Sequence, residues 1–243
     1  MAIAHPTTIG MRPAGLEDWL TRNPKDAPAL ALRAKLIAEK PKIVMALLPA
    51  GEAAVMELGR TLSGRDGWAC PDTASETLAA VGRNYVDDIC VLIKPAEGPY
   101  ILAAGVMCFP NRWHITEKIG KPMLQVHAPV PEYADKLASQ VDFFLDRLRP
   151  GRCFKRGNWG IASVPDLHLP DPVPPVNPGT DANFYVRHEG QSFLKLPETG
   201  AVIFGIRTKI TAWADTAAED REAVLGFAKT LGPEWLKYKS ISA

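Results

Sequence analysis

The sequence lacks most of the patterns that identify a protein class directly. Its four cysteines stand far apart, at Cys70, Cys90, Cys108 and Cys153, which excludes a CxxC redox motif, a zinc knuckle and an iron–sulfur ligand set. A formal charge of +1 gives no reason to expect a nucleic-acid or an acidic membrane partner. No window approaches the roughly 18 apolar residues of a membrane-spanning helix, and the N-terminal residues lack the basic and apolar regions of a signal peptide. We therefore expect a globular cytoplasmic protein whose thiols are free and buried.

Common catalytic and nucleotide-binding motifs are absent as well. The sequence has no GxxxxGK[ST] phosphate loop, no GxGxxG after a strand and no GxSxG nucleophile elbow. Its histidines are not spaced with another His, Cys or carboxylate in a recognisable metal-binding pattern. The lack of CxxCH excludes the usual covalent attachment of haem. Any site must therefore be identified from single residues in their local context.

The order of the predicted elements is typical of an α+β protein. With 243 residues and 47% hydrophobic content, the chain can bury a full core. The predicted helices are 26–40, 51–62, 77–81, 133–148 and 216–231, and the predicted strands are 89–93, 100–108, 153–159, 184–189, 192–196 and 201–210. We expect a single domain, 1–243, with a helical N-terminal part (1–85) and a core (86–243) that contains a largely antiparallel sheet flanked by helices.

Two segments between these elements are expected to lack regular helix. Residues 123–127 are predicted to form a short extended piece. Residues 165–178 contain six prolines in fourteen positions, which favours an extended surface loop or lid.

The segment from Phe109 to Pro131 is the strongest candidate for a functional site. It carries aromatic, cationic and histidine side chains between prolines that limit its freedom, whereas ordinary connecting loops are polar. His127 lies among apolar neighbours, where the neutral imidazole that an axial iron ligand requires is favoured. The alternative is a core histidine that bonds a backbone carbonyl, because no second ligand is spaced with it. His114 follows Trp113 at a predicted helix start and is expected to be exposed.

Several cations are further candidates. Lys118 and Lys121 with Arg112, or Arg156 and Arg207 from neighbouring strands, can receive anionic groups such as phosphate or propionate. A solvated cationic fringe is the alternative for each of them.

Two polar residues near predicted strand ends complete the set. The Asn158 amide can orient a ligand, whereas the adjacent Trp159 is more often a core residue. Glu189-Gly-Gln191 is predicted to connect two strands, where a carboxylate at the rim of the sheet can bind a cationic amine. A simple hairpin turn is the alternative.

Several separated motifs resemble the signature of one family. They are Cys108-Phe-Pro-Asn-Arg-Trp113, Glu117-Lys-Ile-Gly120, Val126-His-Ala-Pro-Val-Pro131, Arg156-Gly-Asn-Trp159, Val186-Arg-His-Glu-Gly-Gln-Ser-Phe-Leu-Lys-Leu-Pro197 and Thr199-Gly-Ala-Val-Ile-Phe-Gly-Ile-Arg-Thr208. In this order they resemble the haem-dependent oxidative N-demethylase family, α-subunit-like. The resemblance spans nearly the whole chain and implies a PAS-like haem-binding fold.

The resemblance implies haem b held non-covalently, with His127 as the axial ligand of the iron. We assign cofactor binding to a set of five residues, His127, Trp113, Lys118, Asn158 and Arg207. Glu189 is assigned the catalytic role of steering the substrate. The implied activity is that of a monooxygenase that oxidises a small secondary amine such as dimethylamine with O2. Its electrons would come from NADPH through flavin and iron–sulfur components of partner proteins, because this chain has no sites for those carriers.

Gly190 departs from the family pattern. Where Glu-Arg-Gln-Thr-Leu is expected, the chain has Glu189-Gly-Gln-Ser-Phe193, so an arginine able to bind a carboxylate or propionate is missing and only Lys195 is nearby. We expect this change to affect the substrate more than the haem. Two alternative functions remain: a non-catalytic haem protein of PAS type that senses or binds a diatomic gas, and a family member that has lost haem and binds another small ligand.

Overall fold

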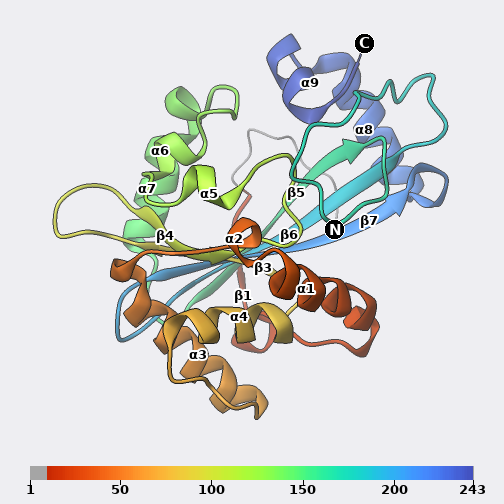
Figure 1. Cartoon of the computed structure of the whole chain (residues 1–243). Helices are drawn as coiled ribbons and strands as arrows, with labels where there is room; N and C mark the ends of the chain where they lie inside the picture. Colours follow the sequence, from red (N-terminus) through yellow and green to blue (C-terminus); the bar gives the residue numbers. More distant parts are fainter. Residues whose placement is uncertain (1–9, 243) are drawn as a thin grey trace.

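The centre of the molecule is one antiparallel sheet. The computed structural model describes residues 10–242, which form seven strands in the spatial order β1-β5-β6-β7-β3-β4-β2 (Figure 1). All neighbouring strands run antiparallel. The strands are β1 (Arg12–Ala14), β2 (Met45–Leu47), β3 (Asp88–Ile93), β4 (Ile101–Val106), β5 (Cys153–Ala162), β6 (Tyr185–Lys195) and β7 (Val202–Ala212). The predicted α+β class is confirmed, including the N-terminal helices.

Helices cover both faces of this sheet. They are α1 (Ala27–Glu39), α2 (Pro41–Val44), α3 (Glu52–Asp66), α4 (Ala74–Asn84), α5 (Ile115–Lys118), α6 (Met123–Val126), α7 (Ala138–Arg147), α8 (Ala218–Thr230) and α9 (Pro233–Lys239). Figure 1 shows α1, α3 and α4 on one side of the sheet and α5 to α7 on the other, with α8 and α9 near one end of β5 to β7.

The face under α1, α3 and α4 carries the larger apolar core. Leu58 and Leu62 of α3 and Leu78 of α4 are fully buried and pack with strand residues such as Ile89 and Ile203. Because strand side chains alternate between faces, Leu194 of β6 faces this core while its neighbour Phe193 faces the other side. We call this side of the sheet the α3 face.

The opposite side, the α7 face, is built around aromatic rings. Phe193 of β6 stacks on Phe204 of β7 with ring centroids 4.6 Å apart, and Phe144 of α7 meets it edge-on at 5.4 Å. Phe154 of β5 is directly opposite Phe193 in the register and belongs to the same cluster. This arrangement fixes which strand residues lie beneath the segment that contains His127.

Several predicted elements differ from the observed ones. Residues 12–14 and 45–47 lie in the part predicted to be helical, yet they form edge strands β1 and β2. Residues 123–126 form the helix α6 and not an extended piece. The predicted helix 133–148 begins with a π-helical turn, Tyr133–Leu137, before α7, and α9 follows the predicted terminal helix.

The largest difference concerns β6. Residues 189–191 do not form a turn, because β6 runs without interruption and pairs with β5 on one side and β7 on the other. Gly190 has low strand propensity, but its position between two long partners decides the conformation. Glu189 therefore lies in the middle of a central strand and not at the rim of the sheet.

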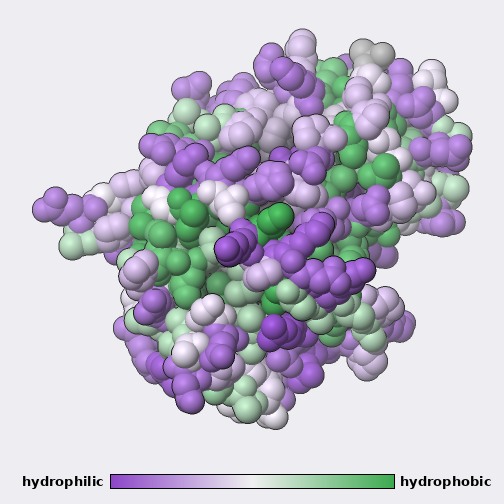
Figure 2. All heavy atoms as spheres, in the orientation of Figure 1, coloured by the Kyte–Doolittle hydropathy of each residue, from purple (hydrophilic) through white to green (hydrophobic). Residues whose placement is uncertain are grey.

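The surface is of mixed character. Figure 2 shows polar side chains over most of the visible face, with apolar residues gathered beside β4. None of the helices in residues 10–242 is long and apolar enough to cross a membrane. All four cysteines are free as predicted, three of them buried and Cys70 half-buried.

Candidate functional site

Buried charges hold the beginning of the segment that carries His127. The Asp88 carboxylate accepts hydrogen bonds from the backbone N–H groups of Cys108 (2.7 Å) and Phe109 (2.8 Å), and it pairs with the fully buried Arg33 at 2.5 Å. On the other side, the buried Arg187 of β6 donates to the carbonyls of Phe109 (3.2 Å) and Pro110 (3.3 Å). A buried ion pair with further hydrogen bonds gives this segment a defined path from the end of β4.

His127 follows directly after α6, and two contacts orient its ring. Its Nδ1 lies 2.9 Å from the carbonyl oxygen of Met123, one helical turn earlier. Its ring stacks on that of Tyr133, with centroids 4.4 Å apart and planes within 8°. Because a carbonyl only accepts hydrogen bonds, Nδ1 carries the proton and Nε2 keeps its lone pair. This nitrogen is the one that can bind a metal.

The surroundings of His127 keep it neutral. Burial, together with the nearby cations Lys118 and Arg156, lowers the pKa of His127 to about 4. The hydrogen bond to Met123 acts in the opposite direction but is outweighed. At neutral pH the side chain is therefore an uncharged imidazole, as the sequence predicted for this apolar setting.

Two of the other predicted cofactor residues lie beside His127. The Lys118 ammonium donates to the carbonyl of Val126, the residue before His127, and lies 5.3 Å from the centre of the Trp113 ring. Burial lowers the pKa of Lys118. His114 is only partly exposed and has its Nε2 3.4 Å from the exposed carboxylate of Asp171. The structure thus brings Trp113, Lys118 and His127 together and leaves His114 apart.

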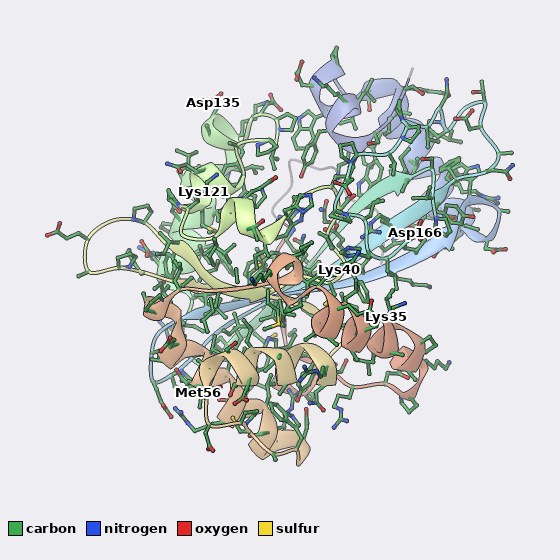
Figure 3. The ribbon with its side chains drawn as sticks, viewed as in Figure 1. Lys35, Lys40, Met56, Lys121, Asp135 and Asp166 are labelled. Carbon is green, nitrogen blue, oxygen red and sulfur yellow. The ribbon has the colours of Figure 1, made fainter. Side chains whose placement is uncertain are left out.

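A cavity of about 790 Å³ opens next to His127. It lies between residues 124–135 and the start of α9, and Trp235 of α9 donates its indole N–H to Glu132 across it at 3.0 Å. Most of its lining is apolar, but Glu132, Asp135 and Glu234 also line it. Asp135 lies at the outer end of this segment (Figure 3). Within residues 10–242, the buried Tyr133 hydroxyl has no hydrogen-bond partner.

A second group of polar residues is centred on Glu189. This carboxylate is 8% exposed and accepts hydrogen bonds from Asn158 of β5 (3.0 Å) and Gln191 (3.2 Å). The Asn158 amide oxygen in turn accepts from the ammonium of Lys239, at 3.1 Å, which also donates to the carbonyl of Trp159. The pairing of Asn158 with Glu189 follows from the register, in which the two residues are directly opposite.

Cations dominate this group. Burial lowers the pKa of Lys239 to about 7, with Arg112 and Arg156 acting in the same direction and Glu189 opposing them. Burial also lowers the pKa values of Arg112 and Arg156. Burial first, and then Glu189, raises the pKa of Tyr238 to about 12. The Glu189 carboxylate lies among the buried Lys239 and the half-buried Arg112 and Arg156, which leaves this region electropositive.

Arg156 links the two groups. It is close enough to affect the pKa of His127 and also interacts with Glu189. By strand alternation, Arg156, Asn158 and Glu189 all lie on the α7 face, where the His127 segment packs. His127 and Glu189 thus belong to one side of the sheet.

Arg207 lies apart from the other predicted cofactor residues. It is directly opposite Gly190 and therefore on the α3 face, where its guanidinium pairs with Asp87 at 2.8 Å and also donates to Thr21. An assignment of Arg207 to the same site as His127 does not agree with this arrangement. The absent side chain of Gly190 also belongs to the α3 face, so it does not alter the surroundings of Glu189 directly.

Comparison with known families identifies the chain. Residues 62–243 match the model of the family described as haem-dependent oxidative N-demethylase, alpha subunit-like. The chain belongs to this family. The family name implies haem and, through the words alpha subunit, other subunits.

Several residues of this family member have the chemistry that a haem group requires. Haem needs one neutral imidazole with a free lone pair, a cavity of a few hundred Å³ with apolar walls, and cations for its propionates. His127 supplies the first and the adjoining cavity the second, while the half-buried Arg112 and Arg156 near Glu189, which do not line this cavity, are candidates for the third. The unpartnered Tyr133 hydroxyl, stacked against His127, adds a donor for a ligand. Within residues 10–242, no cluster of three or more His, Cys, Asp or Glu side chains can hold a metal ion.

Sequence reasoning did not assign roles to Lys239, Tyr238 and Tyr133. Lys239 and Tyr238 reach the site from the last helix, about 80 residues after Asn158. Tyr238-Lys239 also matches the family resemblance at the end of the chain, but nothing near it in the sequence indicates a role. Tyr133 lies only six residues after His127. The sequence predicted it as the start of the helix 133–148 and not as a neighbour of His127.

Proposed function

We propose that this protein binds haem b non-covalently, with His127 as the axial ligand, and oxidises a small secondary amine such as dimethylamine. The observation that carries the proposal is the geometry of His127. Its Nδ1 is fixed by the Met123 carbonyl, its ring is held against Tyr133, and it lines a cavity of about 790 Å³. A second interaction that fixes the ring nitrogen not bound to metal is typical of metal-ligating histidines. The family supports the cofactor and the class of reaction.

When bound, haem supplies the O2 chemistry by which dimethylamine, O2, two electrons and two protons become methylamine, formaldehyde and water. This chain supplies the surroundings. Asn158 and Gln191 orient the Glu189 carboxylate, which is suited to accept a hydrogen bond from a secondary ammonium. The Lys239 Nζ, with a pKa of about 7, can hold or release a proton next to Asn158.

The entrance suits a cationic substrate. Glu132, Asp135 and Glu234 line the cavity, and carboxylates at the opening raise the local concentration of a small ammonium ion. Electrons would come from NADPH through flavin and iron–sulfur groups on other subunits. The reference to an alpha subunit in the family name is in keeping with this requirement.

Turnover by the haem-loaded protein tests the proposed reaction. Dimethylamine is supplied with O2 and a reductase system, and formaldehyde is measured. The unaltered protein should release formaldehyde, and Glu189→Gln should reduce kcat/KM about 100-fold, because the neutral amide no longer pairs with the ammonium group. Glu198→Gln is the matched control, since Glu198 is largely exposed and pairs with Arg60 on the surface.

The spectrum separates the possible outcomes. Both variants should keep the haem absorption of the unaltered protein. Bound haem without formaldehyde release from any small secondary amine would contradict amine oxidation and favour the gas-binding alternative. An equal loss of activity in Glu189→Gln and Glu198→Gln would remove Glu189 from the reaction.

A further inference from the structure

The α3 face contains a second cavity that the proposed reaction does not use. It has a volume of about 340 Å³ and lies over β1, β5, β6 and β7. Its lining includes Arg12, Lys155, Gly190, Ser192 and Arg207. By register these residues face away from His127 and Glu189, whereas Arg156 and Gln191, which also line the cavity, belong to the α7 face.

One glycine, Gly190, lines this cavity. Gly190 of β6 is directly opposite Gly157 of β5 and Arg207 of β7. A Cβ added at Gly190 would meet the Arg207 carbonyl oxygen at 3.8 Å and its Cβ at 3.9 Å, which are ordinary contacts. Close packing does not demand a glycine at this position. The missing side chain of Gly190 leaves space between the cations that line the cavity.

Two cations that line the cavity, Arg12 and Lys155, lie in an electrostatically unfavourable position. Arg12 and Lys155 are directly opposite each other on β1 and β5, and like charges in this position destabilise a strand pair. Ser192 is directly opposite Lys155 and is only 4% exposed. Its side-chain oxygen is buried without a hydrogen-bond partner in residues 10–242. A buried hydroxyl without a partner is costly. An anion between these groups removes both penalties.

The carboxylates at the cavity do not cancel this charge. Asp87 is buried and already paired with Arg207. Asp18 is exposed, and its backbone carbonyl, not its carboxylate, accepts the hydrogen bond from the Lys155 ammonium. Because Asp87 is paired with Arg207, Asp18 is the carboxylate of the lining that remains for Arg12 and Lys155, and it is exposed to solvent.

We propose that this cavity binds a small organic anion through a carboxylate or phosphate group, held by Arg12, Lys155 and the Ser192 hydroxyl. Guanidinium and ammonium groups are the usual ligands of both anions. The volume is near the lower end of the range for small-molecule sites and excludes a large ligand. The missing side chain of Gly190 gives the carbon skeleton room next to the strands.

Calorimetric titration of the full chain at low salt tests this proposal. Succinate and inorganic phosphate are the two probes, which distinguish a carboxylate ligand from a phosphate ligand. At least one of them should saturate a single site with Kd below about 1 mM. Lys155→Gln should weaken that binding about tenfold or more, and Gly190→Val should abolish it by filling the cavity without removing a charge.

Lys209→Gln is the control, because Lys209 is an exposed cation of β7 that does not line the cavity. It should leave the affinity unchanged. Binding of neither probe, or an equal weakening by Lys155→Gln and Lys209→Gln, would overturn the proposal. Should Gly190→Val fail to fold, the comparison of the two lysine variants still decides. None of these results depends on haem, so the proposed oxidation stands or fails separately.

Discussion

At the scale of single residues, His127 shows how one contact can support two interpretations. The bond from Nδ1 to the Met123 carbonyl is what a core histidine would make, and it is also the bond that prepares Nε2 for a metal. The two interpretations differ in what lies beyond the ring. His127 lines a large cavity, whereas a core histidine is enclosed by packed side chains.

Lys239 leads to a prediction about pH. Burial lowers its pKa from the ordinary 10.5 to about 7, so the folded protein releases this proton at a lower pH than the unfolded chain does. Between these values the unfolded state binds more protons, and stability should therefore rise with pH. Urea unfolding at pH 7, 8.5 and 10 measures this rise. In Lys239→Met this part of the rise in stability with pH should disappear. An equal rise in the unaltered protein and in Lys239→Met would contradict the prediction.

The sequence brought some residues of the candidate site together and not others, for a physical reason. Trp113, Lys118 and His127 lie within fifteen residues of one another, so a local motif was enough to place them together. Asn158 and Glu189 required the register of β5 and β6. Arg207 lies on the other face of the sheet, because Thr208, and not Arg207, is directly opposite Glu189 in β7, and a shift of one residue moves a side chain to the other face.

At the scale of elements, long-range pairing overrides local propensity in β6 and β1. Glu189-Gly-Gln191 has the composition of a turn, yet both neighbouring strands hold it extended. Three-residue edge strands such as β1 are too short for a period of two to be recognised, and only their partner strand defines them. By contrast, the hairpin of β3 and β4 was predictable because both of its strands are apolar and adjacent in the chain.

Glu57 joins α3 to the turn between β6 and β7. Its buried carboxylate accepts hydrogen bonds from the backbone N–H groups of Glu198 (2.7 Å) and Thr199 (2.8 Å), and from the Thr199 hydroxyl. Glu57→Gln replaces one accepting oxygen by a donor, so it should lower the free energy of unfolding by about 1–3 kcal/mol. Urea unfolding checks this value, with Glu39→Gln on the exposed surface of α1 as the control. A change no larger than that of the control would show that the carboxylate does not fix this turn.

At the scale of the whole molecule, the sheet separates the main apolar core from the proposed site. The main apolar core lies on the α3 face, whereas His127 and Glu189 lie on the α7 face. Leu58→Ala removes a fully buried side chain from that core and should lower the free energy of unfolding by about 2–5 kcal/mol. Leu16→Ala, at a side chain that is 48% exposed, should change it by less than about 0.5 kcal/mol.

The same variants test the separation itself. Chemical unfolding gives the stability, and the absorption spectrum of the haem-loaded protein reports on the site. Leu58→Ala should be less stable with an unchanged spectrum below its unfolding transition. A spectrum that shifts in the folded Leu58→Ala protein would show that the core and the haem site are coupled through the sheet.

The central claim is that His127 binds haem iron, and one measurement tests it most directly. The purified protein and its His127→Ala and His114→Ala variants are titrated with haem while the Soret absorption is recorded. His127 is in the cavity and His114 is not, so the unaltered protein and His114→Ala should each bind one haem with the same Soret band. His127→Ala should lose the band or bind haem far more weakly. An unchanged Soret band in His127→Ala, or no haem binding by the unaltered protein, would contradict the account.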